Sequence, residues 1–169
     1  TQNPTRPGPA SMYPLCISTT SITHPGVAVP SSAILLLERD AAAGALIQST
    51  LAGVGYAVEA TEDADDAVRR AAEHSLVIID VTDVATSAAE VCREIRGIPS
   101  LAAIPVLCIC QSDDVEERIR FLEVGADDVI AKPFDARELE ARVEALILRF
   151  QRSRDLTPVI AAAGLTERN

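Results

Sequence analysis

The feature that most constrains the fold is an alternation between short apolar runs and helical stretches, which begins at residue 33 and repeats five times. The apolar runs lie at 33–37, 57–60, 76–79, 104–109 and 128–131. Each run is too short for a helix interior and is bounded by turn-forming or charged residues, a pattern typical of buried strands. Five strands that alternate with helices predict an α/β fold, in which a doubly wound parallel sheet carries helices on both faces.

The helical stretches are expected at 40–53, 63–73, 86–97, 112–124 and 135–151. The residues expected to cap their starts are Asp40, Asp63, Thr86, Ser112 and Asp135. The glycines expected at helix ends are Gly53, Gly97 and Gly125. In the last stretch, apolar residues recur at spacings of four, three and four from Leu139 to Phe150. This spacing predicts one helix face packed on the sheet, with a coiled-coil continuation as the alternative.

The chain divides into an arm at 1–32, a domain at 33–151 and a tail at 152–169. The arm holds six of the ten prolines and no acidic residue, so an extended conformation is expected there. Met12 is the only methionine, which leaves open that residues 1–11 come from an expression vector and that Met12 is the natural start. The Ala-rich tail predicts a linker toward a further domain.

The charge balance argues against two classes of partner. The chain has 15 basic and 25 acidic residues, a net charge of -10. A field of this sign repels phosphate backbones and anionic lipids, so neither direct nucleic-acid binding nor membrane binding is expected. Prolines interrupt the uncharged stretch at 7–37, which argues against a membrane-spanning helix. Four cysteines without paired spacing indicate a reduced, cytoplasmic protein.

Candidate functional residues lie where the predicted strands end, because an open parallel sheet gathers functional groups at the carboxyl ends of its strands. These residues are Glu38, Arg39, Asp80, Cys110, Gln111 and Lys132. Asp80 is the most informative of them, because it directly follows the apolar run at 76–79. A carboxylate in this place can serve as a phosphoryl acceptor, a metal ligand or a nucleophile, and a simple cap of the next loop is the alternative.

A set of motifs extends from this aspartate to the last helix. Behind the strand that ends in Asp80, Gly125-Ala126-Asp127-Asp128 is followed by Lys132-Pro133-Phe134 and then by Glu138-Leu139. In this order the motifs resemble the receiver domain of bacterial two-component response regulators, over about 33–149. The resemblance implies a flavodoxin-like sheet with strand order 2-1-3-4-5. It also implies a cis peptide bond before Pro133.

The resemblance implies roles for individual residues. Asp80 corresponds to the aspartate that takes a phosphoryl group from a histidine kinase, and Lys132 to the lysine that holds the phosphoryl oxygens. Mg²⁺ would be held by Glu38, by Asp80 and by the backbone carbonyl of Thr82. Asp40 corresponds to a helix cap and not to a metal ligand.

Three residues depart from the family pattern. Arg39 stands where a second acid should bind Mg²⁺ directly, so binding of the metal is expected to be weakened. Cys110 stands where a Thr or Ser hydroxyl should meet the phosphoryl group, and Val129 replaces an aromatic residue that usually moves with it. Arg39 is also a candidate built-in cation, pairing with Asp80 or Glu38.

These departures favour an atypical receiver that acts by protein–protein interaction, with weak or no dependence on phosphorylation and no expected cofactor. The alternative is an ordinary receiver that binds Mg²⁺ and is phosphorylated on Asp80. A phosphohydrolase with an aspartate nucleophile is a remote alternative, because position 82 is Thr and the next acid is Asp83. No enzyme activity is expected beyond the domain's own phosphoryl transfer.

The expected partners are a histidine kinase or another signalling protein. A homodimer is also considered, through the fourth helix, fifth strand and fifth helix. The charged residues on that face are Arg118, Asp127, Asp128, Glu138, Arg142 and Arg149. Side chains of both signs can pair across a two-fold axis.

Overall fold

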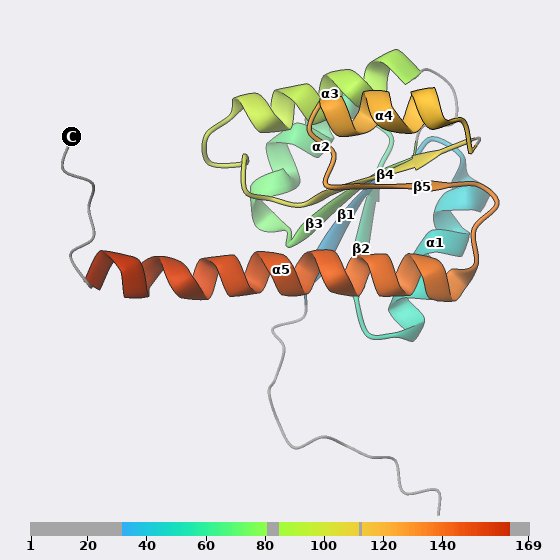
Figure 1. The fold of residues 1–169 in the computed structure, drawn as a ribbon. Helices are drawn as coiled ribbons and strands as arrows, with labels where there is room; N and C mark the ends of the chain where they lie inside the picture. Colours follow the sequence, from blue (N-terminus) through green and yellow to red (C-terminus); the bar gives the residue numbers. More distant parts are fainter. Residues whose placement is uncertain (1–31, 81–84, 112, 163–169) are drawn as a thin grey trace, which may run out of the picture.

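A computed structural model describes residues 32–80, 85–111 and 113–162 (Figure 1). The arm predicted at 1–32, apart from Ser32, lies outside these residues, as do Thr82, Ser112 and the end of the tail at 163–169.

One five-stranded sheet forms the centre of the domain, in the order β2-β1-β3-β4-β5. Its strands are β1 (Ala33–Leu37), β2 (Ala57–Thr61), β3 (Leu76–Asp80), β4 (Val106–Cys110) and β5 (Asp128–Ala131). The helices are α1 (Ala41–Gly53), α2 (Ala64–Arg70), the short 3-10 helix η1 (Ala71–Glu73), α3 (Ala85–Gly97), α4 (Val115–Glu123) and α5 (Ala136–Ala162). All strand pairs are parallel, so the predicted fold class and strand order are confirmed.

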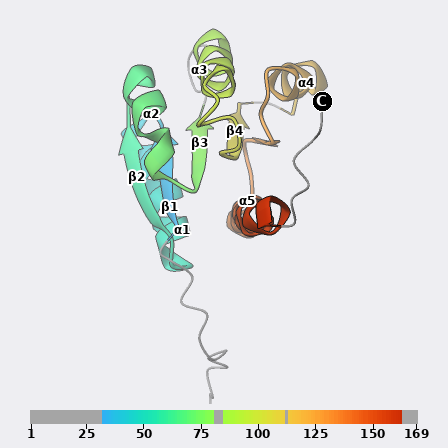
Figure 2. The same ribbon diagram turned by 90° about the vertical axis from the view of Figure 1, so that its left-hand side faces the viewer.

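The helices form two layers around the sheet. The end view in Figure 2 shows α2, α3 and α4 on one face and α1 and α5 on the other. Right-handed crossovers between parallel strands produce this arrangement when the chain winds outward in both directions from the first strand. The sheet is therefore covered on both faces, which agrees with the nearly continuous apolar runs of its central strands.

Two apolar clusters fill the spaces between the layers. Neighbouring residues of a strand contribute to opposite clusters, as in β3, where Val77 and Ile79 pack toward α2, α3 and α4 while Ile78 packs toward α1 and α5. Cys108 and Cys110 of β4 belong to the same cluster, because residues two apart in a strand point to the same face, and both are buried free thiols. Because aromatic residues are scarce, Ile, Leu and Val supply most of this packing.

Three predicted helix caps are confirmed and two are wrong. The carboxylates of Asp40, Asp63 and Asp135 accept backbone N–H groups at the starts of α1, α2 and α5. Helix α3 already begins at Ala85, so residue 86 lies inside it. At α4 the cap is Asp114, whose carboxylate accepts the Glu116 N–H at 3.1 Å, and not residue 112. Asp is as favourable a capping residue as Ser, which is why the sequence alone misplaced this start.

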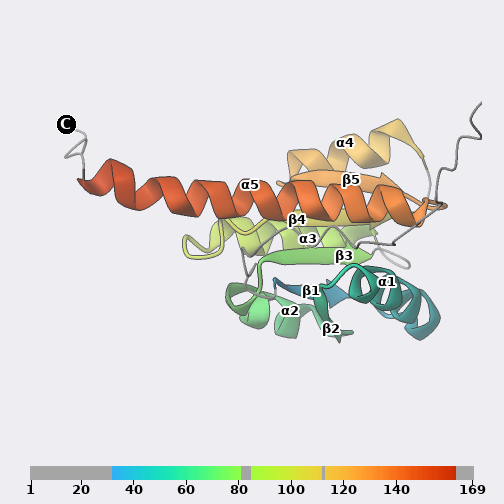
Figure 3. The ribbon, with the colours of Figure 1, turned by 90° about the horizontal axis from the view of Figure 1, so that it is seen from below.

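Helix α5 is longer than predicted. The sequence indicated an end near residue 151, whereas the helix continues to Ala162. Figures 1 and 3 show that its second half projects beyond the sheet. Its first half is fixed to the sheet by the buried residues Leu139, Val143, Leu146 and Ile147, so the predicted packing of one face is confirmed there.

Among the described residues, no helix is both long enough and apolar enough to span a membrane.

Candidate functional site

Three strand ends bring Glu38, Asp80 and Lys132 to the same edge of the sheet. Glu38 directly follows β1, Asp80 is the last residue of β3, and Lys132 directly follows β5. Because β1, β3, β4 and β5 are successive parallel neighbours, their carboxyl ends lie together. The structure thus places at one site the three side chains that the sequence selected from different parts of the chain.

Asp80 and Lys132 form an ion pair at this edge. The Lys132 Nζ lies 2.5 Å from the Asp80 Oδ2, and the Asp80 side chain is fully buried. The Lys132 backbone N–H donates to the Cys110 carbonyl oxygen at 2.8 Å, which fixes the lysine against the end of β4. The peptide bond before Pro133 is cis, as predicted.

The electrostatic environment of Asp80 disfavours its charged form. Burial raises the pKa of Asp80 to about 7, and the neighbouring Glu38 carboxyl adds to this rise. The Lys132 ammonium opposes both effects and does not cancel them. The raised pKa of Asp80 disfavours its carboxylate, and only the carboxylate is a nucleophile.

Glu38 is held by the backbone on either side of it. Its Oε1 accepts the Asp40 N–H at 2.7 Å, and its own N–H donates to the Thr61 carbonyl oxygen at 3.0 Å. The residue is 4% exposed. Gly44 of α1 packs close by, since a Cβ added there would lie 3.3 Å from Glu38 Cγ. Glu38 is thus a fixed acid beside Asp80, supported by the first turn of α1.

Arg39 turns away from the two acids. Its Nε donates to the Glu62 carbonyl oxygen at 3.4 Å, and the side chain is exposed. It forms no ion pair with Asp80 or Glu38, so the expected built-in cation at this position is wrong. Lys132 is the only cation that pairs with Asp80 among the described residues. The two acids and one lysine leave a formal charge of −1 at the site when Asp80 is ionised.

Cys110 and Val129 lie inside the core beside the site. Cys110 is fully buried, and its Sγ donates to the Ile130 carbonyl oxygen at 3.5 Å. Val129 precedes Ile130 in β5, where it lies opposite Cys108, and it is 3% exposed. Cys110 is the last residue of β4 and not a loop residue, because the strand runs from Val106 to this position instead of from 104 to 109. The thiol is therefore engaged with β5.

The described residues supply an incomplete donor set for Mg²⁺. Within them, no three His, Cys, Asp or Glu side chains gather in a way that could hold a metal ion. Glu38 Oε1 already accepts the Asp40 N–H, and Asp80 Oδ2 already faces the Lys132 ammonium. Mg²⁺ needs near-octahedral oxygen ligands, and the position of a second acid carries Arg39. The carbonyl expected to contribute, that of Thr82, lies outside the described residues.

Comparison with known proteins identifies the family. The sequence matches the family model described as "Response regulator receiver domain" over residues 34–144, which is well over half of the chain. This chain belongs to the response regulator receiver domain family. It therefore contains a signalling domain of two-component systems.

Individual relatives agree with this assignment. Transcriptional regulatory protein GltR of Pseudomonas aeruginosa is 36% identical over 120 residues, covering 70% of this chain and 50% of GltR. The receiver domain of a histidine kinase from Syntrophus aciditrophicus is 30% identical with a TM-score of 0.62, covering 69% of this chain and 89% of that one. The receiver domain of the sensor histidine kinase PA1611 of P. aeruginosa, solved with magnesium in its active site cleft, is 27% identical with a TM-score of 0.60, covering 69% and 98%. The chain spans about half the length of the curated relatives it matches.

On the face predicted for a dimer, most charged side chains are not available to pair across a two-fold axis. Most of them are paired within one protomer: Arg118 with Asp113, Arg142 with Asp128 and Glu138, and Asp127 with Arg96. The same region carries an apolar stripe that the sequence reading missed. Its members on α4 are Val115, Ile119 and Leu122, which are 61%, 41% and 50% exposed. The spacing of four and three residues was the available signal, since it places all three on one side of a helix.

Proposed function

We propose that this receiver domain acts mainly by protein–protein interaction and depends weakly or not at all on phosphorylation of Asp80. The observation that carries the proposal is the buried thiol of Cys110, which contacts the Ile130 carbonyl oxygen. A phosphoryl group adds a charge of about −1.5 to −2 and strong acceptor oxygens, so its effect depends on donors that move to meet it. A thiol is a weak donor, and this one is already engaged.

Val129 supports the same proposal. It is packed in the core and has no ring that could change rotamer when the loop after β4 moves. With neither a hydroxyl nor a mobile ring, the phosphorylated and unphosphorylated forms differ little in energy. A modification that does not discriminate between two conformations leaves their populations unchanged.

The interaction surface we propose is formed by α4, β5 and α5. Val115, Ile119 and Leu122 offer an exposed apolar stripe there, and such stripes are typical of contact surfaces. The partner is a histidine kinase, another cytoplasmic signalling protein or a second copy of the chain. The segment at 152–169 is proposed to lead to a further domain, in line with the greater length of GltR.

Two observations favour an ordinary phosphorylated receiver as the second candidate. Asp80 is paired with Lys132, and Arg39 leaves the acid unobstructed because it turns to Glu62. In this candidate Asp80 accepts a phosphoryl group from a kinase and the domain changes conformation. Mg²⁺ dependence would accompany it.

Sedimentation velocity and amide NMR spectra with and without acetyl phosphate or beryllofluoride distinguish the two candidates. We expect unchanged sedimentation and unchanged amide shifts in α4 and β5. A phosphate-dependent shift that Asp80→Asn abolishes would establish the ordinary receiver instead. Cys110→Thr is the matched gain-of-function variant, and it should increase the response of α4 and β5 if the missing hydroxyl is the cause.

A further inference from the structure

A groove between α3 and α4 lies apart from the Asp80 site. Its volume is about 350 Å³, within the range of small-molecule sites. Its apolar lining comes from Ala89 on α3 and from Phe121 and Val124 on or next to α4. Phe121 is 2% exposed and belongs to the core, so it forms the floor of the groove.

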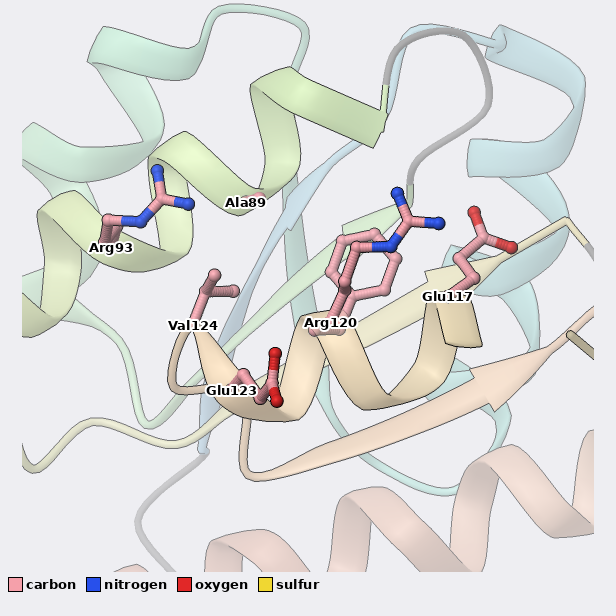
Figure 4. Close-up of a pocket in the computed structure, with 7 residues that line it drawn as sticks. Ala89, Arg93, Glu117, Arg120, Glu123 and Val124 are labelled. Atoms are coloured by element: carbon pink, nitrogen blue, oxygen red, sulfur yellow. The ribbon is translucent and has the colours of Figure 1, made fainter. Parts of the chain in front are cut away.

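Two arginines from different helices line the groove. Figure 4 shows Arg93 on α3 and Arg120 on α4, with Val124 between them in this view. Both side chains are exposed, and neither forms an ion pair or hydrogen bond with any described residue. Other arginines of the same helices are paired: Arg96 of α3 with Asp127, and Arg118 of α4 with Asp113. In a chain with a net charge of -10, two free guanidinium groups on one groove are available for an anion from outside.

We infer that this groove binds a small amphiphilic organic anion, with an aromatic or aliphatic body and one carboxylate or sulfonate group. The body would pack on Phe121, Val124 and Ala89. The anionic group would lie between Arg93 and Arg120, whose planar guanidinium groups suit paired hydrogen bonds to such oxygens.

Acidic residues on the same groove narrow the ligand class. Glu117 and Glu123 also line it, so its charges are balanced overall. A ligand with several negative charges meets repulsion from these carboxylates, whereas a single anionic group can contact the arginines alone. The site therefore favours singly charged amphiphiles over nucleotides and acidic peptides.

The fluorescent anion 8-anilinonaphthalene-1-sulfonate is a direct probe of this site, titrated against the folded chain and mapped by amide NMR. We expect shifts at Ala89, Arg93, Arg120 and Val124. Arg93→Gln and Arg120→Gln should each weaken binding by about fivefold, and the double variant by more than about tenfold. Ala89→Met, which fills the groove without changing charge, should also weaken binding.

Three controls separate this site from other sources of binding. Arg152→Gln removes an exposed arginine of α5 and should leave binding unchanged. Asp80→Asn should leave it unchanged as well, so the inference does not depend on the proposed function. The uncharged N-phenyl-1-naphthylamine should bind more weakly and should not respond to the arginine variants.

Several outcomes would overturn the inference. Shifts confined to the α4-β5-α5 face would place the probe elsewhere. Arginine variants that bind the probe as tightly as the wild type would do the same. Displacement of the probe by a glutamate-rich peptide at a lower concentration than by naphthalene-2-sulfonate would assign the groove to a protein partner. Thermal unfolding of each variant verifies that the loss of binding is not a loss of fold.

Discussion

Arg96 Nη2 lies 2.6 Å from Asp127 Oδ2, and the same carboxylate oxygen accepts the Val106 N–H at 2.8 Å. The guanidinium also donates to the carbonyl oxygens of Gly125 and Ile104, both at 2.7 Å. One side chain of α3 therefore joins the turn before β5 to the segment that enters β4. The Arg96 side chain thereby supplies hydrogen-bond donors to backbone carbonyl groups that lie outside helices and strands.

The first prediction concerns this contact. Arg96→Met should lower the free energy of unfolding by about 2 to 3 kcal/mol, because partly buried carbonyl groups lose charged donors. Urea denaturation measures the change. Arg93→Met on the same helix is the matched control, and it should cost less than about 0.5 kcal/mol because Arg93 has no described partner. Equal losses in the two variants would contradict a specific role for Arg96.

The second prediction concerns the glycine beside it. Gly125 has a φ of +106°, and a Cβ added there would lie 2.7 Å from Arg96 Cγ. Gly125→Ala should therefore destabilise the domain by about 2 kcal/mol through backbone strain and displacement of Arg96. Gly53→Ala is the control, because nothing outside its own stretch of helix lies within 4 Å of the added Cβ and Ala favours the helix. Thermal unfolding should show opposite changes in the two variants.

The third prediction is a pH dependence of stability. The pKa of Asp80 is raised from 3.8 to about 7 in the folded protein. Between these values the folded state holds a proton that the unfolded chain releases, so this group's contribution to stability falls as pH rises from about 4 to about 7. Asp80→Asn removes that fall, and at pH 8 it should stabilise the domain by roughly 2 to 4 kcal/mol.

Denaturation at a series of pH values tests the sign of this pH dependence. The exposed Asp113, whose side chain is 80% exposed, provides the control variant Asp113→Asn, which should retain the wild-type slope. If the stability of the wild type instead rises between pH 4 and pH 7 relative to Asp80→Asn, Lys132 lowers the pKa of Asp80 more than burial raises it.

The fourth prediction concerns Mg²⁺. Wild-type protein should show no saturable Mg²⁺ binding at low millimolar concentration in calorimetric titration, and Arg39→Asp should restore it by supplying a carboxylate ligand. Because Arg39 turns to Glu62, the missing ligand matters more than its positive charge. Arg39→Gln removes the charge alone and should not restore binding. Submillimolar affinity of the wild type for Mg²⁺ would contradict this prediction.

The sequence predicted those features that depend on position along a strand. Asp80 and Lys132 could be assigned to one edge because apolar runs locate strand ends and parallel topology brings those ends together. The direction of the Arg39 side chain could not be predicted, since an exposed arginine has many rotamers of similar energy and local contacts select one. The engagement of Cys110 with Ile130 depends on the register of β4 against β5, which no local pattern encodes.

The projecting half of α5 gives the domain a mechanical lever arm. At 1.5 Å per residue, a helix of 27 residues is about 40 Å long. A tilt of about 5° where Leu139 and Val143 sit on the sheet would displace its far end, about 30 Å away, by roughly 2.5 to 3 Å. A tilt too small to alter the surface of the domain would thus move the end of the helix by a few ångströms.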